Sequence, residues 1–293
     1  MPELPEVQTT ASGLDHFTSG LIITDIWTEY NSPYFYGTDT IKDPKYFKYF
    51  KKKIRGAKII KITRRAKNIL IHLSNNFTIL IHMKMTGHVM YGDYDRTDPF
   101  NRFIRLIFYL SNGKTMELCD TRKFAKVTLL QTKTMHESVH IKDIGPEPLE
   151  EEFTLNIFRN QLHKKPNGKI KLVLMDQSII AGIGNIYADE SLWRAGIHPE
   201  TLVEDLLSRQ NNRRLIALYK AIRITLAHGI NLGGDSMSDY RNIHGKKGKF
   251  QEEHMAYRKT GLHCMKRDCG GKIIRIKLGG RGTHFCSSHQ KKI

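Results

Sequence analysis

The strongest constraint on the fold is a series of short β-branched segments between residues 20 and 132. The segments are LIITDIW, GAKIIKI, NILIHL, FTILIHMKM, FIRLIFYL and TMELC, and they alternate in part between apolar and polar residues. Short turn signals separate them, including LSNNF and the Asn112-Gly113 pair in LSNGK, which favours a tight hairpin. Strands joined by hairpins pair antiparallel, so the pattern predicts a β-sandwich rather than a parallel sheet. We expect a helix over residues 3 to about 16 to pack on it.

The periodicity changes at GPEPLEEEF, where Pro146 and Pro148 interrupt the chain and an acidic run suits a helix start. Helical spacing then continues to about Gly229 in FTLNIFRNQL, KIKLVLMD, NIYADESLWRAG and EDLLSRQNNRRLIALYKAIRITLAHG. The glycine- and lysine-rich segment after it has weak periodicity and is expected to be a mobile loop. A chain of 293 residues suits two or three domains. We therefore predict an α+β multidomain protein with boundaries at 1–140, 141–237, 238–254 and 255–293.

The charge of the chain indicates a polyanionic partner. Lys and Arg number 47 against 29 Asp and Glu, a net charge of +18, and residues 241–293 alone hold 14 basic and three acidic residues. Such a surface binds phosphates with release of counterions. The alternatives are a basic protein with no such partner and one that binds anionic membranes. Because no apolar run approaches the roughly 20 residues of a membrane span and no secretory or lipidation signal is evident, we expect an intracellular, soluble nucleic-acid-binding protein.

Three of the four cysteines form a cluster with metal-ligand spacing near the C-terminus. Two pairs of ligands lie on either side of a hairpin-length spacer, which fits a tetrahedral structural zinc site formed by Cys264, Cys269, Cys286 and His289. Scattered cysteines or an iron–sulfur site are the alternatives, and His263 or His284 could replace the fourth ligand. The remaining Cys119 lies in a strand-like run and is expected to be a buried apolar side chain.

A glycine-rich turn, AGIGNIYADES, precedes one predicted helix. Gly182 and Gly184 permit close backbone approach, and exposed N–H groups at a helix start can bind an anion, with Asn185 at that start. Lys169 and Lys171, in the preceding helical run, could add charge. The competing interpretation is an ordinary glycine turn with an asparagine N-cap.

Two basic segments have a structural and a functional interpretation each. In ITRRAKNILIH, Arg64, Arg65 and Lys67 separate two strands, as in many solvated turns, and they have a function only if a nearby group needs a cation. In CDTRKFAKV, Arg122 and Phe124 could form a wedge that enters a base stack, or Phe124 could be a core residue beside a surface arginine.

The first residues, MPELPE, also allow two interpretations. Pro2 could start a helix whose positive dipole end attracts Glu3 and Glu6. Removal of Met1 would instead leave Pro2 as a free secondary amine, a nucleophile with a carboxylate beside it.

Taken together and in order, these segments resemble the bifunctional DNA glycosylases that include formamidopyrimidine-DNA glycosylase and endonuclease VIII. The resemblance runs over nearly the whole chain, through MPELPEV, RRAKNILIH, ILIHMKMTGHV, DTRKFA, IGPEPL, LMDQSIIAGIGNIYADESLWRAGIHP and the Cys/His cluster. Leucine in PELPE is similar to the formamidopyrimidine branch. The family implies an N-terminal β-sandwich, a helix–two-turn–helix domain and a C-terminal β-hairpin zinc finger.

The resemblance also implies a base-excision-repair activity, in which an oxidised base is removed and the strand is then cut by β,δ-elimination. Pro2 would attack the sugar C1′, Glu3 would act as the acid/base group, and Lys67 would contact the lesion nucleotide and its phosphates. Further implied DNA contacts are void-filling Met85, Arg122 and Phe124, with Arg122 contacting the orphaned partner base. The others are phosphate-binding Lys171, Asn185 and Arg281, pocket residue Glu6, and a capping loop at 238–249. One structural Zn²⁺ per chain, damaged double-stranded DNA as partner and a monomeric state are expected.

The chain departs from the family pattern at two places. The first zinc knuckle has four intervening residues where the family usually has two, and His289 replaces the usual cysteine. The capping-loop region matches poorly, so the sequence leaves open whether the lesion is 8-oxoguanine or formamidopyrimidine, an oxidised pyrimidine or a hydantoin, and which base lies opposite. The rival function is a non-catalytic DNA-binding protein that retained the clamp and the finger. Such a protein would have no need of Pro2, Glu3 and Lys67.

Overall fold

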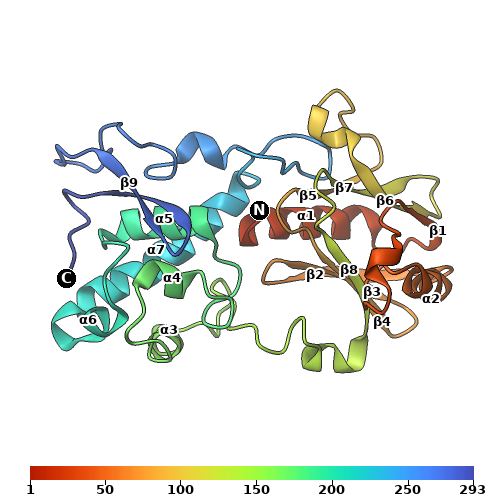
Figure 1. Ribbon diagram of the computed structural model, residues 1–293, viewed down its shortest axis with the longest axis horizontal. Helices are drawn as coiled ribbons and strands as arrows, with labels where there is room; N and C mark the ends of the chain where they lie inside the picture. The colour runs from red at the N-terminus through yellow and green to blue at the C-terminus, as the bar shows by residue number, and fades with distance from the viewer. The chain divides into compact units, whose positions relative to one another are not determined.

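The computed structural model describes residues 1–293, which divide into two units. The first unit comprises Met1–Lys142 and Leu232–Gln251, and the second comprises Asp143–Asn231 and Glu252–Ile293. The chain therefore returns to the first unit after the last long helix (Figure 1). No helix combines the length and the apolar character needed to cross a membrane.

Two four-stranded antiparallel sheets form the first unit, as the hairpin pattern predicts. One has the order β1 (Ile23–Thr28), β6 (Ile104–Leu110), β7 (Thr115–Asp120) and β5 (Gly87–Tyr91). The other has the order β2 (Ile59–Arg65), β3 (Asn68–Leu73), β4 (Phe77–His82) and β8 (Lys126–Gln131). The short strands β5 and β8 were not expected as separate strands. Gly87 is required at the start of β5, because a Cβ there would lie 2.5 Å from the Met83 carbonyl oxygen.

The core of this unit lies between the sheets. Ile69 and Ile71 of β3 join side chains from all the other strands in one buried cluster, whereas Leu70 packs on the opposite face with Leu80 and Ile141. All six residues of β3 are buried, which explains why NILIHL does not alternate with polar residues.

Two helices pack on the sandwich. Helix α1 (Leu4–Thr18) contacts β2, β3 and β5 through a face that includes Val7, Ala11 and Leu14. Helix α2 (Pro44–Ile54) is absent from the sequence-based expectation, although Phe50 and Ile54 lie at helical spacing on one apolar face. The Asp43 carboxylate caps α2, and Phe50 and Ile54 are buried. Short 3₁₀ turns complete the unit at Pro33–Phe35 (η1), Pro99–Arg102 (η2) and Thr132–Glu137 (η3).

The second unit is helical, with a C-terminal hairpin. Its helices are α3 (Leu155–Leu162), α4 (Ile170–Leu174), α5 (Asn185–Ala195), α6 (Val203–Leu207) and α7 (Asn212–Asn231), and its hairpin is β9 (Ile273–Leu278) and β10 (Arg281–Cys286). Helix α5 packs on both α7 and β10. The predicted single run from EDLL to AHG is broken by the 3₁₀ turn Arg209–Asn211 (η4), because the side chains of Ser208 and Asn211 donate hydrogen bonds to the Asp205 carbonyl.

The segment expected to be a mobile loop packs against the first unit through residues 240–245. Arg241 is buried and pairs with Asp98 at 2.6 Å, and Ile243 belongs to the sandwich core. Backbone and side-chain hydrogen bonds join Ile243 to Tyr91 and Gly245 to Asn101. The segment has little regular structure, with only the 3₁₀ turn Phe250–Glu253 (η5) at its end, yet these residues are firmly anchored.

Candidate active site and metal centre

The start of the chain is buried and forms the first turn of α1. Glu3 is the N-cap residue, and its backbone N–H donates to Glu6 Oε2 at 2.7 Å while its side chain accepts from the Glu6 N–H. This reciprocal pair is a capping box. The helix-start interpretation therefore holds for Glu3 and Glu6, but not for Pro2: the proline of the first turn is Pro5, and Pro2 precedes the helix.

The Glu6 carboxylate also binds the segment that follows α7. Its Oε1 accepts a hydrogen bond from the Asp235 N–H at 2.7 Å, and the Tyr240 hydroxyl donates to the Glu6 carbonyl at 3.1 Å. Gly234 has a φ of +85°, and a Cβ there would lie 2.8 Å from Glu6 Cγ. Only glycine fits both the backbone conformation and the close approach of this carboxylate.

Lys67 lies in the tight turn between β2 and β3 and is buried, in contrast to a solvated basic turn. Strand β2 runs along α1, since Ile62 N donates to Asp15 and Arg64 Nε donates to Gln8 at 2.8 Å. Continuing in this direction, the turn reaches the N-terminal end of α1. Lys67 therefore lies at the same end of the helix as Pro2 and Glu3.

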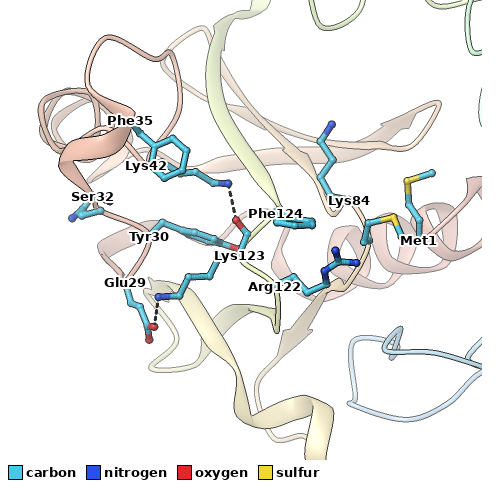
Figure 2. Close-up of a pocket in the computed structure, with 12 residues that line it drawn as sticks. Met1, Glu29, Tyr30, Ser32, Phe35, Lys42, Lys84, Arg122, Lys123 and Phe124 are labelled. Carbon is cyan, nitrogen blue, oxygen red and sulfur yellow. Dashed lines mark hydrogen bonds and ion pairs between the residues drawn. The ribbon is translucent and has the colours of Figure 1, made fainter.

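Two turns of the sandwich present a wedge, the name used here for Met85, Arg122 and Phe124. Met85 lies between β4 and β5, and the other two lie between β7 and β8. The Arg122 guanidinium is 4.4 Å from the centre of the Phe124 ring, a cation–π arrangement. Met85 and Phe124 are each 46% exposed, so Phe124 is not a core residue. All three side chains line one pocket, in which Figure 2 labels Arg122 and Phe124.

Asp120 organises both turns and was not identified as a site residue from the sequence. Its buried carboxylate accepts hydrogen bonds from Thr86 Oγ1 at 2.5 Å, Ala125 N at 2.7 Å and the Tyr30 hydroxyl at 2.9 Å. Thr86 Oγ1 in turn accepts from Arg122 N at 3.2 Å. Burial and the Asp120 charge raise the pKa of Tyr30, which keeps this hydroxyl a neutral donor. The available sequence signal was an aspartate directly before a turn.

In the second unit, Asn185 and Lys171 meet the hairpin at the same carbonyl. Asn185 is the first residue of α5 after the N-cap Gly184, and its Nδ2 donates to Gly282 O at 3.1 Å. Lys171 is fully buried, with Nζ 2.7 Å from Asp189 Oδ1 and 3.3 Å from Gly282 O. The asparagine N-cap interpretation is therefore wrong, because Gly184 has that position. Arg281, at the start of β10, is exposed.

The four expected metal ligands converge in the same unit. Ligand atoms of Cys264, Cys269, Cys286 and His289 all lie within 4.8 Å of one another. Cys264 Sγ is 3.4 Å from His289 Nδ1, and Cys269 Sγ is 3.6 Å from Cys286 Sγ. Tetrahedral zinc with its usual bond lengths separates such ligand atoms by roughly 3.5–3.8 Å, so the residues fit this ion. His284 is not the fourth ligand, because its backbone and ring face Asp189.

A second layer of contacts orients two of these ligands. His289 Nε2 is 3.0 Å from the Trp193 carbonyl oxygen, which can only accept, so Nε2 has the proton and Nδ1 is free to bind a metal. The Trp193 indole donates to Cys264 Sγ at 3.2 Å. With four protein ligands and no open position, the site suits a structural rather than a catalytic metal.

Comparison with protein families gives two matches along the chain. The model of the formamidopyrimidine-DNA glycosylase N-terminal domain matches residues 1–127, and that of the formamidopyrimidine-DNA glycosylase H2TH domain matches residues 144–241. The chain is 38% identical over 292 residues to a formamidopyrimidine-DNA glycosylase of Desulforamulus reducens, covering 99% of both chains. It is 35% identical to the one of Bacillus subtilis, covering all of both.

Solved structures give the same result. The chain is similar to Lactococcus lactis Fpg in a complex with DNA that contains an abasic site, with a TM-score of 0.84, 34% identity and coverage of 99% of this chain and 100% of that one. A point mutant of the same Lactococcus lactis protein, bound to DNA that contains Fapy-dG, gives a TM-score of 0.84 at 35% identity with equal coverage.

Proposed function

The chain belongs to the formamidopyrimidine-DNA glycosylase family of DNA repair enzymes, and we propose that it is a bifunctional glycosylase and AP lyase. In this proposal it excises oxidised bases from double-stranded DNA and then cuts the strand by β,δ-elimination. The observation that carries the proposal is the burial of Pro2, Glu3 and Lys67, with β2 running along α1 toward the start of that helix.

The reaction begins with removal of Met1, which makes Pro2 a secondary amine. An unperturbed α-amine has a pKa of about 7.7–8.0, so a useful fraction is neutral near pH 7. A cation such as Lys67 favours the neutral form further. The neutral nitrogen attacks C1′, the glycosidic bond breaks, and the departing base takes a proton while the nitrogen loses its own.

Glu3 then acts as the acid/base group. It protonates the ring oxygen as the sugar opens to an iminium, which accepts electrons from the C2′–H bond once that proton is removed. The 3′ phosphate leaves in the first elimination and the 5′ phosphate in the second. If Met1 were retained, the Pro2 nitrogen would be an amide and the whole sequence of steps would stop.

Binding of the damaged DNA uses residues of both units. The wedge fills the void of the everted base, which offsets part of the few kcal/mol that eversion costs. Glu6 and residues 238–249 receive the everted base. Asn185 and Arg281 bind phosphates. Lys171 is buried and ion-paired, so its phosphate contact stays a prediction, and its evident contribution is to hold Gly282 beside Asn185.

One Zn²⁺ held by the Cys/His cluster supplies structural stabilisation to the hairpin that positions Arg281. The proposed working state is a monomer. These features would also be present in a non-catalytic DNA-binding protein, and the chemistry of Pro2 separates the two functions.

Borohydride reduction tests the proposal on an oligonucleotide with one abasic site. Protein without Met1 should form a covalent complex, whereas Pro2→Gly and Glu3→Gln should trap little or none. Glu137→Gln, an exposed glutamate of the first unit, is the matched control and should behave as the parent chain does. Absence of a complex with the processed chain would contradict the enzyme and leave DNA binding alone, whereas normal trapping by Pro2→Gly would show that the covalent step does not need the proline nitrogen.

A further inference from the structure

We propose that the pocket lined by the wedge binds one unstacked nucleobase of the undamaged DNA strand. It is called here the second pocket, to distinguish it from the proposed site of the everted damaged base. This inference rests on the proposed function and adds to it a base-binding site on the strand that is not cut. The second pocket has a volume of about 740 Å³, within the range of small-molecule sites, and all its lining residues belong to the first unit. One of them is Met1, which the processed chain lacks.

Three aromatic rings surround the hollow, as Figure 2 shows. Tyr30 is buried and fixed in place by its hydrogen bond to Asp120. Phe35 is 38% exposed and Phe124 is 46% exposed, so both present ring surface to a ligand. Stacking on such rings is the usual way in which proteins hold single bases, because every base has a π-face.

The charged residues of the second pocket favour a nucleotide over an uncharged ligand. Lys42, Lys84, Arg122 and Lys123 line it, against Glu29 alone, a net charge of +3. The Glu29 carboxylate is already compensated by Arg105 and by Lys123 Nζ, 2.8 Å away. The backbone phosphates on either side of a captured base would therefore meet cations.

Lys42 joins the two walls of the second pocket. Its Nζ donates to the Lys123 carbonyl at 2.7 Å, in the turn that bears the wedge, and lies 5.2 Å from the centre of the Phe35 ring. The segment around η1 is thereby held to the β7–β8 turn. Asn31 and Ser32, on the same lining, add an amide and a hydroxyl that can bond to base edges.

The undamaged strand is the occupant that the arrangement favours. Glu6 and residues 238–249, the proposed site of the everted damaged base, contribute nothing to the second pocket. Met85, Arg122 and Phe124 do line it, so a base displaced by the wedge from the other strand would be next to these rings. We therefore assign the everted base and the opposite-strand base to two separate sites.

A binding cycle with inert DNA tests the assignment. Each duplex has a tetrahydrofuran abasic analogue in one strand. In the other strand, the facing position and the two flanking positions are tested one at a time, each with either a normal base or a second tetrahydrofuran. At one of these positions, Phe35→Ala should weaken binding about tenfold when the base is present and much less when it is absent. Tyr34→Ala, the adjacent residue, is the matched control, because Tyr34 is 96% exposed and does not line the pocket.

Lys42→Met provides a second variant and should show the same dependence on the base. Melting temperatures check that the Phe35→Ala and Lys42→Met variants are folded. An equal loss with and without the base, or no loss, would overturn the proposal. Because tetrahydrofuran does not react, the cycle is independent of borohydride trapping. If the chain is trapped normally but the effect of Phe35→Ala does not depend on the base, only the second-pocket proposal is overturned. If that dependence is seen without trapping, only the catalytic proposal is overturned.

Discussion

Glu6 connects Asp235 to the beginning of α1 through the two oxygens of one carboxylate. Oε1 accepts the Asp235 N–H and Oε2 accepts the Glu3 N–H, each at 2.7 Å. The conformation at residues 234–235 and the first turn of the helix are thus held by a single buried group. Any change in this carboxylate affects both.

Glu6→Gln should lower the free energy of unfolding by about 2 kcal/mol. The amide can accept at only one of the two sites and would turn an N–H₂ group toward the N–H at the other, so one charge-assisted hydrogen bond is lost. Urea denaturation measures the difference, with Glu137→Gln as the exposed control. An unchanged midpoint and slope would show that the bridge contributes nothing.

Asp120→Asn should reduce base excision more than strand cutting. An amide cannot accept from Thr86, Tyr30 and Ala125 together, so the wedge turns lose their common support. Excision from a lesion needs base eversion and should slow about tenfold or more, whereas cleavage at a preformed abasic site needs less of the wedge. Single-turnover assays on the two substrates give the ratio. Asp93→Asn, at an exposed position, should leave it unchanged.

Lys171→Met should destabilise the second unit by about 3–5 kcal/mol, because Asp189 would remain buried without its cation. Adding Asp189→Asn should recover part of the loss, since the asparagine oxygen can still accept from His284 N. The matched control is Lys165→Met, which breaks an exposed pair of equal length, 2.7 Å, and should cost under about 1 kcal/mol. Equal losses for Lys171→Met and Lys165→Met would contradict this account.

Trp193 offers an optical signal for the metal site. The chain has two tryptophans, and the Trp27→Phe variant leaves only the one whose indole donates to Cys264. Chelation should shift the emission of Trp193 to the red and weaken DNA binding, and Zn²⁺ should restore both. His289→Cys should keep the metal, and Cys286→Ser should weaken DNA binding. Less than one zinc per chain in the purified protein would contradict the site.

His88 should make stability depend on pH between about 6.5 and 4. Burial lowers the pKa of His88 to about 4, so the folded chain keeps it neutral while the unfolded chain takes up a proton below about 6.5. The contribution is complete above that pH and decreases as the pH falls, by about 1.4 kcal/mol per unit. Burial also lowers the pKa of His82, to about 3, which adds a similar slope.

His88→Gln isolates the first contribution, because its amide can still donate to Asn101 as the imidazole Nε2 does. Between pH 6.5 and pH 5 the parent chain should lose about 2 kcal/mol more than this variant, measured by urea denaturation. Parallel pH profiles for the two chains would show that His88 does not titrate as described.

The sandwich could be predicted from sequence because its strands are β-branched and joined by short turns. Helix α2 was missed, although its sequence has the signals of a helix: Asp43 before Pro44, and Phe47, Phe50 and Ile54 at helical spacing. The spacing of Cys264, Cys269, Cys286 and His289 located the metal site from the sequence, and the structure brings the same four residues together. The register of β10, which turns His284 toward Asp189, excludes one alternative fourth ligand.

The roles of site residues whose partners are distant in sequence could not be predicted from the sequence. Lys171 looked like a free cation in a helical run, and its pairing with Asp189 requires the fold of α4 against α5. Asp120 and Tyr30 are 90 positions apart, and Lys42 and Lys123 are 81 apart. Local patterns cannot indicate such contacts, because each joins residues of different elements that only the packing of the fold brings together.

Glu3 caps a helix and is also the proposed acid/base group, and these two roles limit which substitutions position 3 can accept in evolution. Its side chain closes the first turn of α1, and the same carboxylate is proposed to move protons at the sugar. A replacement that abolishes hydrogen-bond acceptance would unwind the helix start as well as stop the chemistry, so a folded but inactive descendant is accessible mainly through Asp, Asn, Ser or Thr. Chains of this lineage that have lost activity should therefore still have a helix-capping side chain at position 3.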